Sequence, residues 1–301
     1  MIKVGIIGYG RYGKKYYENL ANIKNFKVIK ILRRKKTKSL KFTNNKKEFF
    51  KLKNIDLYII ASPTFTHFQY LDQIIRKNKN IIIEKPLVKY FYQYQLLKDK
   101  IKKYKKIILI NHTDLYMNAY SKLKEEIKYI GKIKTINLYY GKNDLYYLNN
   151  ISNTTDLPYF EWLPHPLAII KDLFYKNNFK FKLKQKKIIN KFIVKQKIKI
   201  IFFNKNIIIN LFFSNYYKNP KRNINIVGTK GTLLYRGYNK KKLFLKKKNK
   251  KKYLKTNDVD PIKNLLLDFY KKYKRKYLLD DRKFLLATAG KLFEISNSVK
   301  H

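Results

Sequence analysis

The first thirteen residues constrain the fold more than any other stretch of the sequence. Residues Met1–Ile7 have strand character, and the pattern turns helical from Lys14 to Ile23. The intervening residues, Gly8-Tyr9-Gly10-Arg11-Tyr12-Gly13, have the spacing Gly-x-Gly-x-x-Gly. Directly after a strand and at the start of a helix, this spacing is the fingerprint of a dinucleotide-binding turn. Gly8 would form the tight turn, Gly10 would let backbone approach a pyrophosphate, and Gly13 would allow close strand–helix packing. The alternative is a glycine-rich turn in an α/β domain that binds no nucleotide.

The end of the second predicted strand, Phe26–Leu32, indicates which dinucleotide would bind. In NAD-binding domains an acidic residue about 20 positions past the glycines accepts hydrogen bonds from the ribose. Here that position is Arg33 (33 − 13 = 20), followed by Arg34, with no Asp or Glu nearby. Arginine suits a ribose 2′-phosphate, so we favour NADP over NAD as the cofactor. The alternative is that lysine-rich drift has replaced an acidic residue.

The formal net charge of +52 is the most unusual global property of the chain. Lys, Asn, Ile, Tyr and Phe share AT-rich codons and are abundant, and the lysines are spread along the whole chain. We therefore attribute the charge to genome bias and expect no specific nucleic-acid partner, while a basic nucleic-acid-binding protein remains an alternative. In either case the charge should attract anionic ligands at low salt.

Several features are missing from the sequence. A strand begins almost at Met1, so we expect no signal peptide, and no apolar run has the length of a membrane span. The absence of cysteine removes disulfides, cysteine zinc sites and thiol nucleophiles. We therefore expect a cytoplasmic protein that neither contacts a membrane nor holds a metal.

The rest of the first half alternates apolar strands with amphipathic helices, which predicts a mostly parallel, doubly wound sheet. Functional residues of such sheets lie just beyond the carboxyl ends of the strands. Ser62–His67 and Glu84–Pro86 occupy such positions. The expected strands are Ile55–Ala61, Asn80–Ile83 and Lys106–Ile110, and the expected helices are Phe68–Asn78 and Tyr90–Lys105, with a capping-box-like start to a short helix at Asn45–Glu48.

Three motifs together, Gly8–Gly13, Ser62-Pro63-Thr64-x-x-His67 and Glu84-Lys85-Pro86, resemble the N-terminal signatures of the Gfo/Idh/MocA family. This family of NAD(P)-dependent oxidoreductases includes glucose–fructose oxidoreductase and inositol 2-dehydrogenase. The resemblance implies that Lys85 reaches the substrate hydroxyl and the nicotinamide. It also implies that the Ser62–His67 motif, including Pro63 and Thr64, lies along the cofactor. Without the resemblance, Glu84-Lys85 would read equally well as a solvated pair, and His67 as a helix residue with no ligand.

The pattern changes from helical crossovers to sheet after about residue 117, so we predict a Rossmann domain over residues 1–117 and an α+β domain over residues 118–301. A helix is expected at Asn118–Ile130, ending at Gly131. The following strands alternate apolar residues with Lys or Asn, which predicts a large, mainly antiparallel sheet with one open face. The resemblance implies that this face joins subunits of a homo-oligomer. The expected later elements are strands Lys132–Tyr140, Lys180–Leu183, Phe192–Phe203, Ile207–Phe213, Asn225–Val227 and Thr232–Tyr235, an edge hairpin in Lys240–Lys252, and helices Pro261–Tyr273 and Arg282–Ser296.

A stretch around His165 resembles the catalytic segment of the family, which has an Asp four residues before a catalytic His. Here Glu161 stands at that position (165 − 161 = 4), and Ala168 replaces a second acidic residue found in many members. Two prolines flank His165 and should hold its backbone rigidly. The resemblance implies His165 as general base, Lys85 as the residue that polarises the oxygen, and Glu161 as the group that fixes the imidazole or binds a hydroxyl. The candidate substrate contacts are Asn111, Tyr116 and Trp162.

These features predict an NAD(P)-dependent oxidoreductase that transfers a hydride between nicotinamide and a secondary alcohol or ketone. The substrate would be a sugar, a cyclitol or a nucleotide-sugar. A non-catalytic NAD(P)-binding member of the family remains an alternative, because Glu161 and Ala168 depart from the common pattern.

Overall fold

The computed structural model describes residues 1–35, 39–147, 150, 154–190, 192–248, 250–275 and 279–299. The chain forms two compact units. The first unit comprises Met1–Thr113 and Asp260–Gly290, and the second comprises Asp114–Val259 and Lys291–His301.

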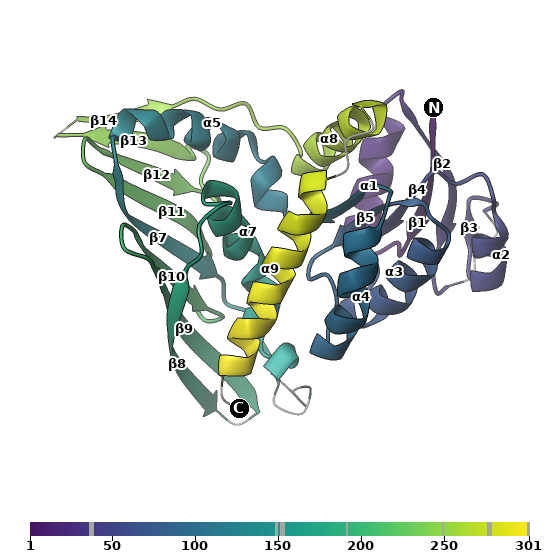
Figure 1. The fold of residues 1–301 in the computed structure, drawn as a ribbon, viewed down its shortest axis with the longest axis horizontal. Coiled ribbons are helices and arrows are strands. Elements are labelled where there is room, and N and C mark those ends of the chain that lie inside the picture. Colours follow the sequence, from purple (N-terminus) through teal and green to yellow (C-terminus); the bar gives the residue numbers. More distant parts are fainter. Residues whose placement is uncertain are drawn as a thin grey trace. The chain divides into compact units, whose positions relative to one another are not determined.

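A six-stranded sheet in the order β3-β2-β1-β4-β5-β6 forms the centre of the first unit (Figure 1). Every neighbouring pair of these described strands is parallel, as predicted from the alternating pattern. The strand order reverses between β1 and β4, and open sheets of this type bind ligands beside such a reversal, at the carboxyl ends of the strands. The strands are β1 (Ile2–Ile7), β2 (Phe26–Leu32), β3 (Phe42–Thr43), β4 (Leu57–Ile60), β5 (Asn80–Glu84) and β6 (Ile108–Asn111).

Helices cover this sheet because the connections of a parallel sheet must cross back over it. Helix α1 packs against α8, and α3 packs against α4. Asn45 caps α2 by accepting a hydrogen bond from the backbone N–H of Glu48 (3.2 Å), whereas the Glu48 carboxylate accepts from Thr43. The helices are α1 (Arg11–Ala21), α2 (Lys46–Lys51), the short η1 (Thr64–Thr66), α3 (His67–Arg76), α4 (Phe91–Lys103), α8 (Pro261–Arg275) and the first part of α9 (Leu279–Ser298).

The first unit is completed by residues that come late in the chain. The Asn19 amide donates to the Asp260 carboxylate (3.2 Å), and the ring of Phe26 on β2 packs against Phe269 on α8. The Tyr94 hydroxyl donates to the carbonyl of Leu286 (3.1 Å). Residues 260–290 therefore contribute both hydrogen bonds and apolar contacts to the Rossmann unit.

An eight-stranded sheet in the order β14-β13-β12-β11-β7-β10-β9-β8 dominates the second unit (Figure 1). Among its described strands, β7 and β10 pair in parallel and the other neighbours pair antiparallel. Ile136, Leu138 and Tyr140 on β7 are buried, while the alternating Asn137 and Tyr139 are half-buried. The predicted open-faced sheet is thus confirmed. The strands are β7 (Ile133–Gly141), β8 (Lys180–Asn190), β9 (Ile193–Phe203), β10 (Ile208–Ser214), β11 (Lys221–Gly228), β12 (Thr232–Arg236), β13 (Leu243–Lys247) and β14 (Lys250–Leu254).

Short helices of the second unit pack near the buried face of this sheet. The predicted helix after residue 117 forms and ends at Gly131, which has the positive φ of 74° that glycine tolerates. The Tyr159 hydroxyl on α6 donates to Ser296 near the end of α9 (2.8 Å). These helices are η2 (Thr113–Tyr116), α5 (Asn118–Glu126), η3 (Ile127–Ile130), η5 (Thr154–Asp156), α6 (Pro158–Trp162) and α7 (Pro164–Leu173). Within the described residues, we find no helix with the length and apolar character that crossing a membrane requires.

Candidate active site

The glycine turn between β1 and α1 has the geometry that a bound pyrophosphate requires. Gly8 has φ of 95°, and a Cβ at Gly13 would lie 2.2 Å from the Gly8 carbonyl oxygen, so both positions exclude other residues. A Cβ at Gly10 would instead point into space with no atom within 4 Å. Among the described residues no side chain caps α1 with a hydrogen bond, and the first turn of the helix contains no acidic residue. A helix start directs its backbone N–H groups and positive dipole end toward an anion, so this turn fits an NAD(P) pyrophosphate.

Arg33 lies directly after β2, where the adenosine ribose of a dinucleotide would lie. Its backbone N–H donates to the carbonyl of Thr43 (2.9 Å). Its guanidinium carbon lies 5.4 Å from the centre of the Phe42 ring and 6.0 Å from that of Tyr9. Both distances are in the range of cation–π contacts, which orient the guanidinium. Arg34, the next residue, is exposed.

His67 links the loop after β4 to the loop after β5. One ring nitrogen, Nε2, lies 2.9 Å from the carbonyl oxygen of Ser62, and Nδ1 lies 2.9 Å from that of Pro86. Burial lowers the pKa of His67, against the opposing effect of these carbonyls. The two motifs that stood apart in the sequence are therefore joined by one buried imidazole. The Ser62 and Thr66 hydroxyls share a hydrogen bond in the first of these loops (2.6 Å).

Glu84, at the end of β5, is the centre of a buried hydrogen-bond network beside Lys85. Its Oε1 accepts from the Tyr16 hydroxyl (3.0 Å) and from the Asn111 amide (2.7 Å). Burial raises the pKa of Glu84, although both donors oppose the rise. Asn111 is itself fully buried. The structure thus places Asn111 as a partner of Glu84, while Lys85 is half-buried at the end of the same strand.

His112 is a buried residue of the first unit that the sequence reasoning did not identify. It follows β6, and its ring contacts the edge of Phe284 at a centroid distance of 6.0 Å. Among the described residues neither of its ring nitrogens has a hydrogen-bond partner. Burial, with a contribution from the charge of Lys85, lowers the pKa of His112 to about 3. The imidazole is therefore neutral at physiological pH.

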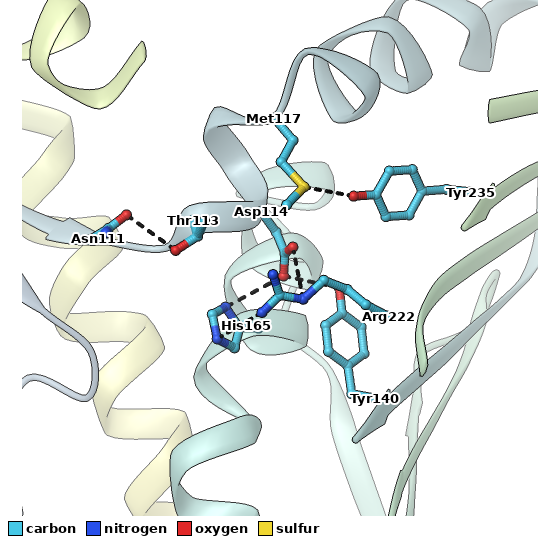
Figure 2. Close-up of polar contacts among 8 residues, drawn as sticks. All are labelled: Asn111, Thr113, Asp114, Met117, Tyr140, His165, Arg222 and Tyr235. Carbon is cyan, nitrogen blue, oxygen red and sulfur yellow. Dashed lines mark hydrogen bonds and ion pairs between the residues drawn. The ribbon is translucent and has the colours of Figure 1, made fainter. Parts of the chain in front are cut away.

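The second unit holds a buried cluster of three polar side chains from three elements: Asp114 on η2, His165 on α7 and Arg222 on β11 (Figure 2). His165 Nδ1 lies 3.5 Å from Asp114 Oδ2, and Arg222 Nε lies 3.4 Å from Asp114 Oδ1. Arg222 Nη2 lies 3.3 Å from His165 Nε2. The exposed fraction of His165 is 3% and that of Asp114 is 1%. Both of these distances from Asp114 are longer than normal hydrogen bonds, and the contact with Arg222 is within ion-pair distance.

Two tyrosines and one tryptophan surround the Asp114–His165–Arg222 cluster. The Tyr140 hydroxyl donates to Asp114 Oδ2 (3.2 Å), and burial together with the charge of Asp114 raises the pKa of Tyr140. The Tyr140 ring lies nearly parallel to that of His165, with centroids 6.5 Å apart. The Tyr235 hydroxyl contacts the sulfur of Met117 (Figure 2), and the ring of Trp162 lies 6.4 Å from that of His165. The rings of Tyr140 and Trp162 thus both lie near the His165 ring.

The carboxylate that contacts His165 within the described residues belongs to Asp114, a residue that the sequence motifs do not include. Glu161 lies on α6 and is exposed. Ala168 is fully buried on α7, three residues after His165. Asp114 lies 51 positions before His165 (165 − 114 = 51). Only the fold brings them together, so no motif spacing signalled this pair.

Residues 2–112 match the family model described as an oxidoreductase family with an NAD-binding Rossmann fold. No curated protein sequence matches the chain. Three solved structures share its fold over nearly the whole length. The first is UDP-N-acetylglucosamine 3-dehydrogenase from Acidithiobacillus ferrooxidans, with 14% identity and a TM-score of 0.81 over 99% of this chain and 97% of that chain. The second is biliverdin reductase from Synechocystis sp. in complex with biliverdin and NADP⁺, with 13% identity and a TM-score of 0.79 over 99% of this chain and 98% of that chain. The third is a 3-ketoreductase from Actinomadura kijaniata in complex with NADP, with 13% identity and a TM-score of 0.79 over 97% of this chain and 96% of that chain.

The glycine turn, the strand order and the strand-end motifs define an NAD(P)-binding Rossmann unit. Over residues 2–112 this unit matches the model of the Gfo/Idh/MocA family of oxidoreductases. At the identities given above, the solved structures establish a shared fold and leave the substrate open.

Proposed function

We propose that the chain is an NAD(P)-dependent dehydrogenase or reductase that acts on a secondary alcohol or ketone of a sugar, a cyclitol or a nucleotide-sugar. The observation that carries this proposal is the buried His165, held between an acid and a cation, in a chain whose other unit offers a dinucleotide-binding turn. Imidazole is the side chain best suited to take and return a proton near neutral pH.

Each predicted catalytic residue has a distinct part in this proposal. When bound, the nicotinamide cofactor supplies the hydride chemistry. His165 removes the hydroxyl proton in oxidation and returns it in reduction. Lys85 polarises the substrate oxygen, and Glu161 binds a further hydroxyl. Tyr116 and Trp162 are proposed substrate contacts. Asn111, fully buried and bonded to Glu84, supports the segment that carries Lys85.

Two features support finer assignments within this proposal. Arg33, oriented by the Phe42 and Tyr9 rings, suits a ribose 2′-phosphate and favours NADP over NAD. Two of the proteins with the same fold were solved with an NADP cofactor, and two are described as a UDP-sugar dehydrogenase and a ketoreductase. We therefore propose a small-molecule, sugar-like substrate and a cytoplasmic location.

The half-exposed face of the eight-stranded sheet supports a homo-oligomer. Phe212 and Tyr139 stack on this face with centroids 4.8 Å apart, and the Asn210 amide donates to Asn137 (3.0 Å) beside them. Ile208, at the start of β10, is 48% exposed. An exposed apolar side chain beside half-buried aromatic rings is typical of a surface that a second subunit covers.

The proposal is tested by separating cofactor binding from turnover. Purified protein is titrated with NADPH and NADH by nicotinamide fluorescence, then assayed with sugars, cyclitols and nucleotide-sugars. Lys85→Ala should lose turnover at least about 1000-fold while cofactor affinity changes less than about threefold. Lys106→Ala, which removes an exposed lysine from the amino end of β6, is the matched control and should retain full activity.

The alternative functions predict different results in the same experiment. Cofactor binding without turnover of any substrate would favour a non-catalytic NAD(P)-binding protein. Absence of NADPH and NADH binding would refute both the enzymatic and the non-catalytic proposals. Full turnover by Lys85→Ala would refute the mechanism and leave the cofactor assignment standing.

A further inference from the structure

We propose that Asp114 and Arg222 are positioning residues that hold His165 as a neutral imidazole, with its proton on Nδ1 and its lone pair on Nε2. The inference deepens the proposed function, and it rests on that function only where it concerns catalysis. It assigns roles to two residues that lie far from His165 in the sequence and that no motif identified. All three side chains belong to the second unit.

Arg222 determines which ring nitrogen of His165 is bare, that is, unprotonated and carrying a lone pair. A guanidinium has five N–H donors and no acceptor, so its Nη2 can only donate to His165 Nε2 at 3.3 Å. Nε2 must therefore present a lone pair. An imidazolium would turn an N–H toward the N–H of Arg222 and bring two positive groups together in a buried site. The contact with Arg222 thus excludes the charged form of the ring in this arrangement.

Asp114 determines where the remaining proton resides. A neutral imidazole with a bare Nε2 carries its proton on Nδ1, and Nδ1 faces Asp114 Oδ2 at 3.5 Å. The contact is longer than a hydrogen bond, as is common for catalytic contacts before a substrate is bound. The same oxygen accepts from the Tyr140 hydroxyl, and the other oxygen faces Arg222 Nε. Each member of the Asp114–His165–Arg222 cluster therefore contacts the other two.

The charges of Asp114 and Arg222 compensate each other, so the Asp114–His165–Arg222 cluster needs no charge on His165. Burial alone would lower the pKa of Arg222, but the carboxylate of Asp114 raises it above its ordinary value, so Arg222 stays charged. Asp114 and Arg222 then form a buried pair of opposite charge, which needs additional polar contacts to offset its desolvation. Tyr140 and the neutral His165 supply these contacts. Among the described residues, Asp114, Arg222 and Tyr140 are titratable groups that face the His165 ring.

The arrangement prepares His165 for one proton transfer. A substrate hydroxyl that replaces Arg222 Nη2 at Nε2 finds a lone pair directed at it. In oxidation the hydroxyl proton moves from oxygen to Nε2, its O–H bond electrons remain on oxygen, and the hydride leaves carbon for the cofactor. The imidazolium that forms is stabilised by Asp114 at Nδ1. In reduction the same proton returns to the oxygen. Arg222 thus holds the site of the substrate hydroxyl until substrate binds.

The position of the proton is measurable in the full chain without cofactor or substrate. Protein labelled with ¹⁵N in its four histidines is observed by long-range ¹H–¹⁵N correlation, and His165 is assigned from the signals lost in His165→Gln. Wild type should show a protonated Nδ1 and a bare Nε2 at neutral pH. In Arg222→Met, part of the population should carry the His165 proton on Nε2 and the rest on Nδ1. In Asp114→Asn, the preference of this proton for Nδ1 should be lost. Asp258→Asn, which removes a surface ion pair with Lys242, is the control and should leave the His165 signals unchanged.

The wild-type spectrum alone decides the inference, so variants that fail to fold do not block the test. A proton on Nε2, or a doubly protonated ring at neutral pH, would overturn it. If the protein proves to be an active oxidoreductase, Asp114→Asn should lower kcat by about 100-fold with little change in cofactor KM, and should move the acidic limb of the kcat profile. Failure of NAD(P)H binding would remove the proposed function and leave the tautomer assignment intact.

Discussion

Replacing Gly10 with alanine should remove cofactor binding while leaving the fold intact. A Cβ at this position meets no atom of the protein within 4 Å, and the backbone φ of −82° suits an L-residue. Alanine is a poorer helix N-cap than glycine, which lowers the free energy of unfolding. Alanine also reduces the conformational entropy of the unfolded chain, which raises the free energy of unfolding by a similar amount, about 0.4–1 kcal/mol. The net change in unfolding free energy should therefore lie within about 1 kcal/mol, which corresponds to a Tm shift of about 4 °C or less.

The effect of the same substitution on binding should be much larger. Phosphate oxygens approach backbone N–H groups to about 2.9 Å, and the space that a Cβ at Gly10 would enter is the space such an anion needs. We expect the Kd for NADPH to rise at least about 50-fold, which is roughly 2.3 kcal/mol. Gly13→Ala should behave in the opposite way. Its Cβ would lie 2.2 Å from a backbone oxygen, so it should lower unfolding free energy by about 3 kcal/mol or more.

The assay combines a fluorescence titration with NADPH and a thermal melt of each variant. The titration is made at about 0.15 M salt, where a Debye length of about 8 Å screens the general attraction of a basic chain for anions. Wild-type affinity in Gly10→Ala would refute the assignment of the pyrophosphate to this turn. Wild-type melting in Gly13→Ala would show that the close approach of Gly8 and Gly13 is not rigid.

Three further predictions concern single residues. Arg33→Ala should raise the Kd for NADPH about 10-fold or more and change that for NADH less than about threefold, in paired titrations. His112 has a pKa of about 3 in the folded protein and about 6.5 when unfolded, so the unfolded chain binds more protons between these values and stability falls as pH drops below 6.5. His112→Leu should reduce this fall by up to about 1.4 kcal/mol per pH unit in urea unfolding, and an unchanged slope would contradict the assignment. Tyr120→Phe removes a 2.7 Å hydrogen bond to Asp172 and should cost about 1.5 kcal/mol, whereas a loss below about 0.3 kcal/mol would show that the bond does not stabilise the fold.

The Rossmann unit was predictable because its signals are local. Glycines at fixed spacing, buried strands such as Leu57–Ile60 and motifs at strand ends are each read within a few residues, and the structure confirms the parallel sheet that they predict. The open-faced sheet was predictable for the same reason, since the alternation along β7 and β9 has a period of two residues.

The polar cluster around His165 was not predictable, because its members are joined only by tertiary structure. Asp114 and Arg222 stand in short segments with no spacing that relates them to His165, and their link depends on how η2, α7 and β11 pack. His112 was overlooked for a similar reason: its burial follows from the packing of Phe284, which comes 172 residues later (284 − 112 = 172). The roles of Lys85, Glu161 and the other predicted site residues remain predictions that the experiments above address.

The late-chain segment that completes the first unit has a consequence for biosynthesis. The apolar side chain of Phe26 is covered by Phe269, and Tyr94 bonds to Leu286, so part of the Rossmann core is closed only by residues 260–290. During translation the first 113 residues leave the ribosome long before these partners exist. At about 5–20 residues per second, an interval of roughly 7–35 s separates the two. Over that interval the nascent unit exposes apolar surface that residues of α8 and α9 cover in the folded chain. Expression of residues 1–113 alone should therefore yield an aggregation-prone fragment.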